Sequence, residues 1–362
     1  MRFGALGVAG AGSAWRRRVR RDWLAWFRRR WLWWLVIIGF IIFLVLSRGE
    51  LATLGQTLLQ GDPLWLGAAV LAQSAYYSLY AAQYKYGFAT VEVASEVREL
   101  IPVMFASIFL RTIVPSGGVS GAAVFVDDAA RRGQSAARAA EGSLLVLAVD
   151  LSTLLPLVAI ALGYLAYRHV LVFYEVFGSV LFALFVASLG AALFTGRLAP
   201  HLLRRGLHEL QWITNELGRR LQHRPLLPEG WAARNAGDLA RAANDIATHQ
   251  GSLGQTLGVA SAAQLTNLAT VHLVGQAFGQ PLSLGAIIAS FSMQAVFSVV
   301  TFIPNGLVVA EGVMVAVLTS LGVAFGSAVA ITIVYRGLSV WLPLLVGFLF
   351  LRQVRSFGGR GR

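Results

Sequence analysis

Long apolar stretches alternate with short polar segments along most of this chain. Each of six stretches is about long enough to cross a bilayer as one helix: residues 31–47, 63–84, 142–167, 171–194, 255–279 and 327–350. A helix rises about 1.5 Å per residue, so roughly 17 to 25 apolar residues span the hydrocarbon layer. The pattern therefore predicts an all-α polytopic membrane protein with about six full transmembrane helices.

Two further apolar stretches are interrupted near their middles. Residues 101–126 are broken by Pro115, Ser116, Gly117 and Gly118, and residues 284–324 are broken by Pro304, Asn305 and Gly306. Proline and glycine end a helix and free its backbone amides, which at membrane depth must be buried in protein or line a wet cavity. We therefore predict two re-entrant helical hairpins. The rival interpretation is a bundle of eight to ten kinked spans.

The distribution of basic residues predicts the topology. With both termini in the cytoplasm and no net crossing at either hairpin, the inside segments carry 26 basic residues and the outside loops carry two, Arg48 and Arg168. Cytoplasmic loops of membrane proteins are enriched in Lys and Arg. Two full crossings at each break would leave the ends unchanged, so the count supports the topology and leaves re-entrancy open.

This topology gives two span–hairpin–span units that run in opposite directions. The first covers residues 63–167 and its hairpin enters from the cytoplasm, whereas the second covers 255–350 and its hairpin enters from outside. Inverted repeats with broken helices near the midplane are a transporter architecture. The expected transmembrane domain, residues 31–350, is therefore built as an inverted repeat.

Three polar segments surround or interrupt this domain. Residues 1–30 are rich in Arg and Trp and are interpreted either as a helix lying in the headgroup layer or as a plain basic flank. Residues 195–254 predict a cytoplasmic amphipathic helical insert, which is a candidate surface for a partner protein. Residues 351–362 form a basic cytoplasmic tail.

Composition agrees with a membrane location and narrows the chemistry. The chain is 57% hydrophobic and 13% charged, has a net charge of +13 and contains no cysteine. Disulfides, thiol catalysis and cysteine-ligated metals are therefore excluded. The basic residues flank apolar stretches, so they indicate anionic lipid headgroups as partners and argue against nucleic acid. The expected location is a bacterial inner membrane.

Four charged residues fall inside the apolar stretches: Arg111, Asp150, Glu311 and Arg336. Intramembrane charges are expensive and need a partner or a function. In one interpretation they form buried ion pairs that set helix register. In the other, Asp150 and Glu311 balance charge or couple a proton, and a phosphate group is bound by the two arginines with the residues at the breaks: Arg111, Pro115, Ser116, Gly117, Gly118, Ser120, Asn305, Gly306 and Arg336.

Enzyme motifs are absent in any fitting context. Ser120 has the wrong glycine spacing for a nucleophile turn and is interpreted as a turn residue. The histidines show no metal-ligand spacing, so we expect no catalytic residue, cofactor or metal. Gln264, Asn267 and His272 form a polar stripe, which we expect to hydrogen-bond a neighbouring helix.

The sequences around the two breaks resemble one known family. The motifs are Leu110 to Gly121, Arg132-Gly133-Gln134-Ser135 and Asp150 for the first break, then Phe302 to Gly306, Glu311-Gly312 and Tyr335-Arg336-Gly337 for the second. They are similar to the signatures of the lysylphosphatidylglycerol synthase membrane-region, or flippase-like, family. At the second break, family members usually carry Pro-x-Pro-Gly-Gly, and this chain departs from that pattern with Ile303-Pro304-Asn305-Gly306-Leu307. We expect a member without the aminoacyl-transferase domain.

The resemblance implies a membrane region that passes lipids between leaflets. The leading hypothesis is thus a lipid translocase for an anionic phosphate headgroup, such as that of a phospholipid or a polyprenyl-phosphate carrier. One alternative is a scaffold or accessory subunit of a lipid- or glycan-modifying pathway, acting through residues 195–254. A less favoured alternative is a membrane enzyme that acts on lipid-linked substrates.

Overall fold

The computed structural model describes residues 56–113, 119–198, 250–301 and 308–350, with single positions between 199 and 249. The chain divides into two compact units, Met1–Leu51 and Ala52–Arg362, and all described residues belong to the second. The described part is almost entirely helical and contains no strand. Its elements are α3 (Pro63–Thr90), α4 (Val97–Ile113), α5 (Val119–Arg131), α6 (Ala136–Tyr167), α7 (Phe173–Leu198), α10 (Gln250–Ala277), α11 (Leu284–Val300), α12 (Val309–Ser320), α13 (Phe325–Arg336), a π-helical turn (Gly337–Trp341) and α14 (Leu342–Phe350).

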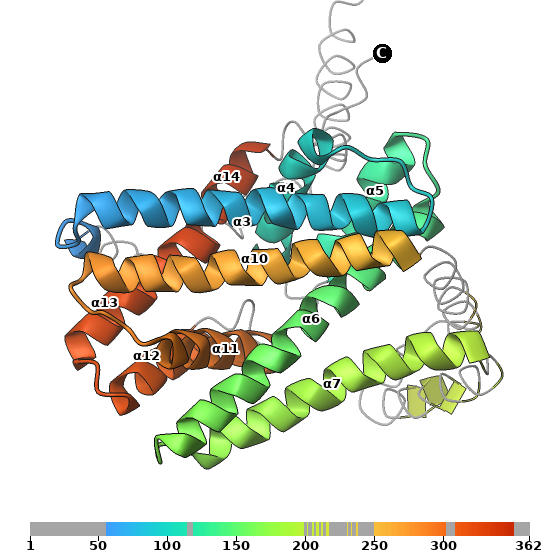
Figure 1. Cartoon of the computed structure of the whole chain (residues 1–362). Helices are drawn as coiled ribbons and strands as arrows, with labels where there is room; N and C mark the ends of the chain where they lie inside the picture. Colours follow the sequence, from blue (N-terminus) through green and yellow to red (C-terminus); the bar gives the residue numbers. More distant parts are fainter. Residues whose placement is uncertain are drawn as a thin grey trace, which may run out of the picture. The chain divides into compact units, whose positions relative to one another are not determined.

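Helices α3 and α10 lie side by side along their lengths (Figure 1). The Asp62 side chain caps α3 by accepting a hydrogen bond from the Leu64 amide at 2.8 Å. The Asp62 amide donates to the Ala277 carbonyl at 2.9 Å, which joins the start of α3 to the end of α10. The two helices therefore run in opposite directions.

The first predicted break separates α4 from α5. Helix α4 ends at Ile113 and α5 begins at Val119, on either side of the proline–glycine segment. The two helices pack against each other, and the Ser107 hydroxyl donates to the Gly121 carbonyl at 2.9 Å. A Cβ at position 121 would lie 2.9 Å from that hydroxyl oxygen, so glycine is what permits this close approach.

The second predicted break separates α11 from α12. The Ser283 side chain caps α11, and that helix ends at Val300, ahead of the proline at 304. Helix α12 begins at Val309 and packs back against α11. Helix α13, the π-helical turn and α14 then follow as one continuous apolar segment, Phe325–Phe350.

Four described helices are long and apolar enough to cross a membrane: Ala136–Tyr167, Phe173–Ala191, Gly251–Ala277 and Phe325–Phe350. The predicted all-helical, multi-pass membrane protein is thus confirmed. Helix α3 has 28 residues but is not among the four, because its glutamines and tyrosines lower its hydropathy. The predicted span at 31–47 lies outside the described residues. The total span count and the re-entrant hairpins stay predictions.

Helix α6 holds the described helices together. It packs against α3, α5, α7, α10 and α11, and it contributes to an apolar core shared with α10 to α13. It ends at Tyr167, and α7 follows after a short turn in which His169 has a φ of 57°. Described positions from 201 to 216 are helical, but most of the predicted insert, residues 1–30 and residues 351–362 lie outside the described part.

Candidate functional site

A row of three tyrosines on α3 faces Arg111 of α4. Tyr76, Tyr80 and Tyr84 recur every four residues, which places them on one helix face. Their successive ring centroids are 5.8 and 5.5 Å apart. All three interact electrostatically with Arg111, as does Asp150 of α6. Arg111 keeps an exposed surface although α3 and α6 supply its neighbours.

Asp150 is held in place by a chain of amide side chains on α10. Gln264 Nε2 lies 3.3 Å from Asp150 Oδ1 and 3.5 Å from the Thr153 hydroxyl, so it can donate to both. Asn267 Nδ2 donates to Gln264 Oε1 at 3.5 Å, and both amides are buried. The prediction that this polar stripe hydrogen-bonds a neighbouring helix is confirmed for Gln264, because its partners lie on α6.

A second polar cluster surrounds Arg336 at the end of α13. Arg336 is 5% exposed, and its Nε lies 2.5 Å from Glu311 Oε1 on α12. The other carboxylate oxygen, Oε2, is buried and has no hydrogen-bond partner among the described residues. Arg336 and Glu311 therefore neutralise each other, which agrees with the ion-pair interpretation of these two charges.

The π-helical turn directly after Arg336 is tied to α3. The Tyr77 hydroxyl donates to the Leu338 carbonyl at 2.5 Å. Tyr335, one residue before Arg336, is buried and interacts electrostatically with both Tyr76 and Arg336. The cluster around Arg111 and the cluster around Arg336 are therefore connected through α3. π-Helical turns such as the one after Arg336 are frequent at functional sites.

Several predicted site residues cannot be placed. Pro115, Ser116, Gly117, Gly118, Asn305 and Gly306 lie outside the described residues. Ser120 is the second residue of α5, and its side chain is not described. Among the residues that are described, the structure brings Arg111 near Asp150 and pairs Arg336 with Glu311. In the part of the chain that the structure covers, no group of three acidic or histidine side chains could hold a metal ion.

The tyrosine row was missed by the sequence-based site prediction. Its signal was present, because hydroxyl-bearing aromatic residues at a spacing of four on a predicted span mark one continuous helix face. What the spacing did not show is that this face meets Arg111 of the next helix. The site therefore contains neutral hydroxyl groups as well as the predicted charges.

Comparison with known proteins agrees with a membrane domain. Residues 31–347 match the model of a family described as the lysylphosphatidylglycerol synthase TM region. No curated protein matches the chain.

Proposed function

The chain belongs to the family of the lysylphosphatidylglycerol synthase transmembrane region, and we propose that it translocates a lipid with an anionic phosphate headgroup. Membership of this family places the protein in lipid metabolism or transport. The headgroup binds beside Arg111, between the two broken helix pairs, while the acyl chains remain in the lipid. The protein lies in a bacterial inner membrane with both termini in the cytoplasm.

The observation that carries this proposal is the environment of Arg111. An arginine on an apolar helix is costly unless it is paired or exposed to water. Arg111 is exposed, and no acidic side chain in the described ranges forms an ion pair with it within 4 Å. Its planar fork and the neighbouring tyrosine hydroxyls are suitable donors for phosphate oxygens. Arg336 differs, because its guanidinium already forms an ion pair with Glu311.

The arrangement of the helices supports alternating access. Helices α3, α4, α5 and α6 have 28, 17, 13 and 32 residues, and α10, α11, α12 and the segment 325–350 have 28, 17, 12 and 26. We call α3 to α6 the first set and α10 to the segment 325–350 the second set. In each set, the first and third helices both pack against the second and the fourth. The fourth helix of each set packs against the second helix of the other, through α14 with α4 and α6 with α11.

These correspondences favour an inverted repeat. The first helices of the two sets are antiparallel, as the bond from Asp62 to Ala277 requires. Two similar halves of opposite orientation can exchange conformations, so that one closes as the other opens. A headgroup bound between them would then face first one leaflet and then the other.

The test is lipid transport by purified protein in liposomes. Headgroup-labelled phosphatidylglycerol and a labelled polyprenyl phosphate are incorporated separately, and the fraction protected from an impermeant quencher is followed with time. We expect wild type to move one of them, and Arg111→Ala to lose at least tenfold in rate. Arg98→Ala is the matched control, because Arg98 is an exposed arginine at the other end of α4.

Equal rates for wild type, Arg111→Ala and empty liposomes with every lipid would refute translocation. A scaffold role through residues 195–254 would then gain support if deletion of that segment abolished function in cells. Conversion of a lipid into a new product by the purified protein would instead indicate an enzyme.

A further inference from the structure

We propose that Tyr76 and Tyr80 are binding residues for the lipid headgroup, and that Tyr84 anchors them. The inference rests on the proposed function, since it assigns neutral hydrogen-bond donors to the phosphate group that Arg111 holds. The row runs along one face of α3, and Tyr76 is next to Tyr77, whose hydroxyl bonds to the π-helical turn near Arg336.

Burial separates the three tyrosines into two roles. Tyr84 is buried and stacks on Phe125 of α5 with ring centroids 3.7 Å apart, so its ring fixes the position of the row. Tyr76 and Tyr80 are only half-buried. Their rings stack at 5.8 Å and 21°, which orients both side chains along the same side of α3.

Neutral donors suit the charge of the surrounding site. Asp150 lies near enough to interact electrostatically with Arg111, and Glu311 pairs with Arg336. Additional cations at this depth would carry a large desolvation cost, whereas a tyrosine hydroxyl donates to a phosphate oxygen without adding charge. The phenol ring also keeps the hydroxyl close to the apolar part of the lipid. Tyr76 and Tyr80 therefore add neutral hydrogen-bond donors to the headgroup site, in which Arg111 supplies the positive charge.

Tyrosine-to-phenylalanine substitution tests this assignment because it removes the hydroxyl and keeps the ring. The Tyr76→Phe, Tyr80→Phe and double variants are titrated with the transported lipid, and both binding and transport rates are measured. A hydrogen bond to a charged group supports an expected loss of about tenfold in affinity per hydroxyl. Tyr86→Phe, a half-buried tyrosine on the same helix outside the row, is the control.

The outcomes distinguish this assignment from the function on which it rests. The assignment is overturned if wild type transports lipid and the double variant binds and transports as Tyr86→Phe does. It is supported if the half-saturating lipid fraction rises while the folded state, followed by thermal unfolding, is unchanged. If wild type binds the phosphate lipid without moving it, and the variants lose binding, the site stands and translocation fails.

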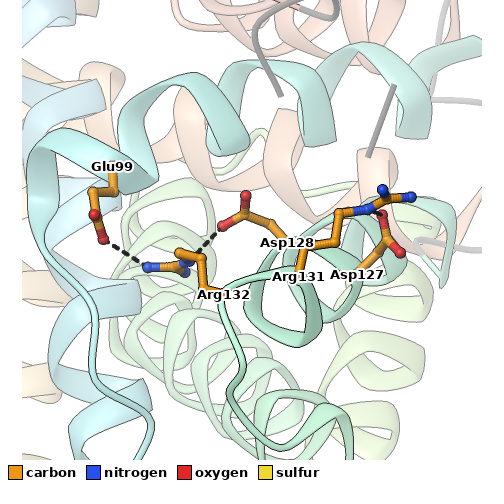
Figure 2. Close-up of polar contacts among 5 residues, drawn as sticks. All are labelled: Glu99, Asp127, Asp128, Arg131 and Arg132. Atoms are coloured by element: carbon orange, nitrogen blue, oxygen red, sulfur yellow. Dashed lines mark hydrogen bonds and ion pairs between the residues drawn. The ribbon is translucent and has the colours of Figure 1, made fainter. Parts of the chain in front are cut away.

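A separate set of ion pairs lies at the base of α4, α5 and α6. Glu92 pairs with Arg138 at 2.6 Å, and Glu99 pairs with Arg132 at 2.7 Å. The first pair joins the connection before α4 to the first turn of α6, and the second joins the first turn of α4 to the residue that follows α5. Figure 2 shows the second of them, in which Arg132 lies between Glu99 and Asp128, with Asp128 at 2.9 Å. We call Glu92, Glu99, Arg132 and Arg138 the base latch.

The structure assigns the base latch to holding the bases of α4 and α5 and the start of α6 together as one moving body. The Arg132 side chain is 11% exposed and lies between two carboxylates, which restrict its movement. Each connecting segment also contains a residue in the left-handed region, Glu92 with a φ of 57° and Gly133 with a φ of 80°. Such residues permit sharp changes of chain direction, and a non-glycine residue there is strained. The connections can thus act as hinges beside a closed base.

Covalent closure of the base tests this role, and the absence of native cysteine makes it practicable. A Glu92→Cys, Arg138→Cys variant is joined by a short bis-maleimide reagent, with the single Arg138→Cys variant as control. If the bases of α4 and α5 and the start of α6 move as one body, the joined protein retains its transport rate within about twofold. Arrest of transport by joining would overturn the assignment, because the base would then have to open.

Hydrogen exchange provides a readout that does not depend on transport. Arg132→Glu repels both of its carboxylate partners, and we expect faster exchange in residues 91–99 and 131–138 together. Combination with Glu99→Arg restores one pair and should return part of the protection. Faster exchange confined to one of the two segments would contradict the latch, whether or not the protein moves lipid.

Discussion

Removal of the Glu311 charge tests the energetics of the buried ion pair with Arg336. Glu311→Gln leaves Arg336 buried at 5% exposure without its carboxylate partner, which contacts it at 2.5 Å in the native protein. Breaking a buried ion pair from one side costs roughly 3–5 kcal/mol. The Glu311 side chain is 21% exposed, so we expect the lower end, about 3 kcal/mol.

The measurement is reversible unfolding in mixed detergent–SDS micelles, followed by tryptophan fluorescence. Glu92→Gln is the matched control, because its pair with Arg138 is close, at 2.6 Å, but has side chains 61% and 49% exposed. Exposed pairs contribute roughly 0–1 kcal/mol. Equal losses in the two variants would refute the reasoning. Adding Arg336→Met to Glu311→Gln should recover most of the loss, since no buried charge then remains unpaired.

Two further substitutions test packing and backbone contacts by the same unfolding assay. A Cβ at Gly347 would lie 2.2 Å from the Phe105 carbonyl oxygen, so Gly347→Ala should force α14 from α4 and cost at least about 1–3 kcal/mol, whereas Gly163→Ala, with no neighbour within 4 Å, should cost nothing. Tyr77→Phe removes the donor to the Leu338 carbonyl and should cost about 1–3 kcal/mol. Losses below about 0.5 kcal/mol would contradict either contact.

The helices and their breaks could be predicted because their causes are local. Apolar length sets which segments are helical in a membrane, and proline with glycine ends a helix wherever it occurs. The first break therefore fell between α4 and α5, and the second between α11 and α12, as expected. Helix ends were less accurate, since α3 and α6 continue beyond their apolar parts into the polar segments.

The pairing of charges could not be predicted in the same way. Two arginines and two acids on separate helices allow more than one pairing, and nothing in their spacing selects one. The structure places Glu311 against Arg336, 25 residues apart, and leaves Arg111 exposed near Asp150. The predicted equivalence of the two arginines as phosphate ligands stays a prediction, but their environments differ.

The sequence by itself determined that this is a helical membrane protein, where its helices break, and which charges fall within its apolar stretches. These properties depend on composition and on residues close together in the chain. Only the tertiary structure decided which helix faces meet: α3 against α10, the tyrosine row against Arg111, and the base latch across the α4–α5 pair. Such contacts depend on packing among distant segments, which local periodicity cannot specify.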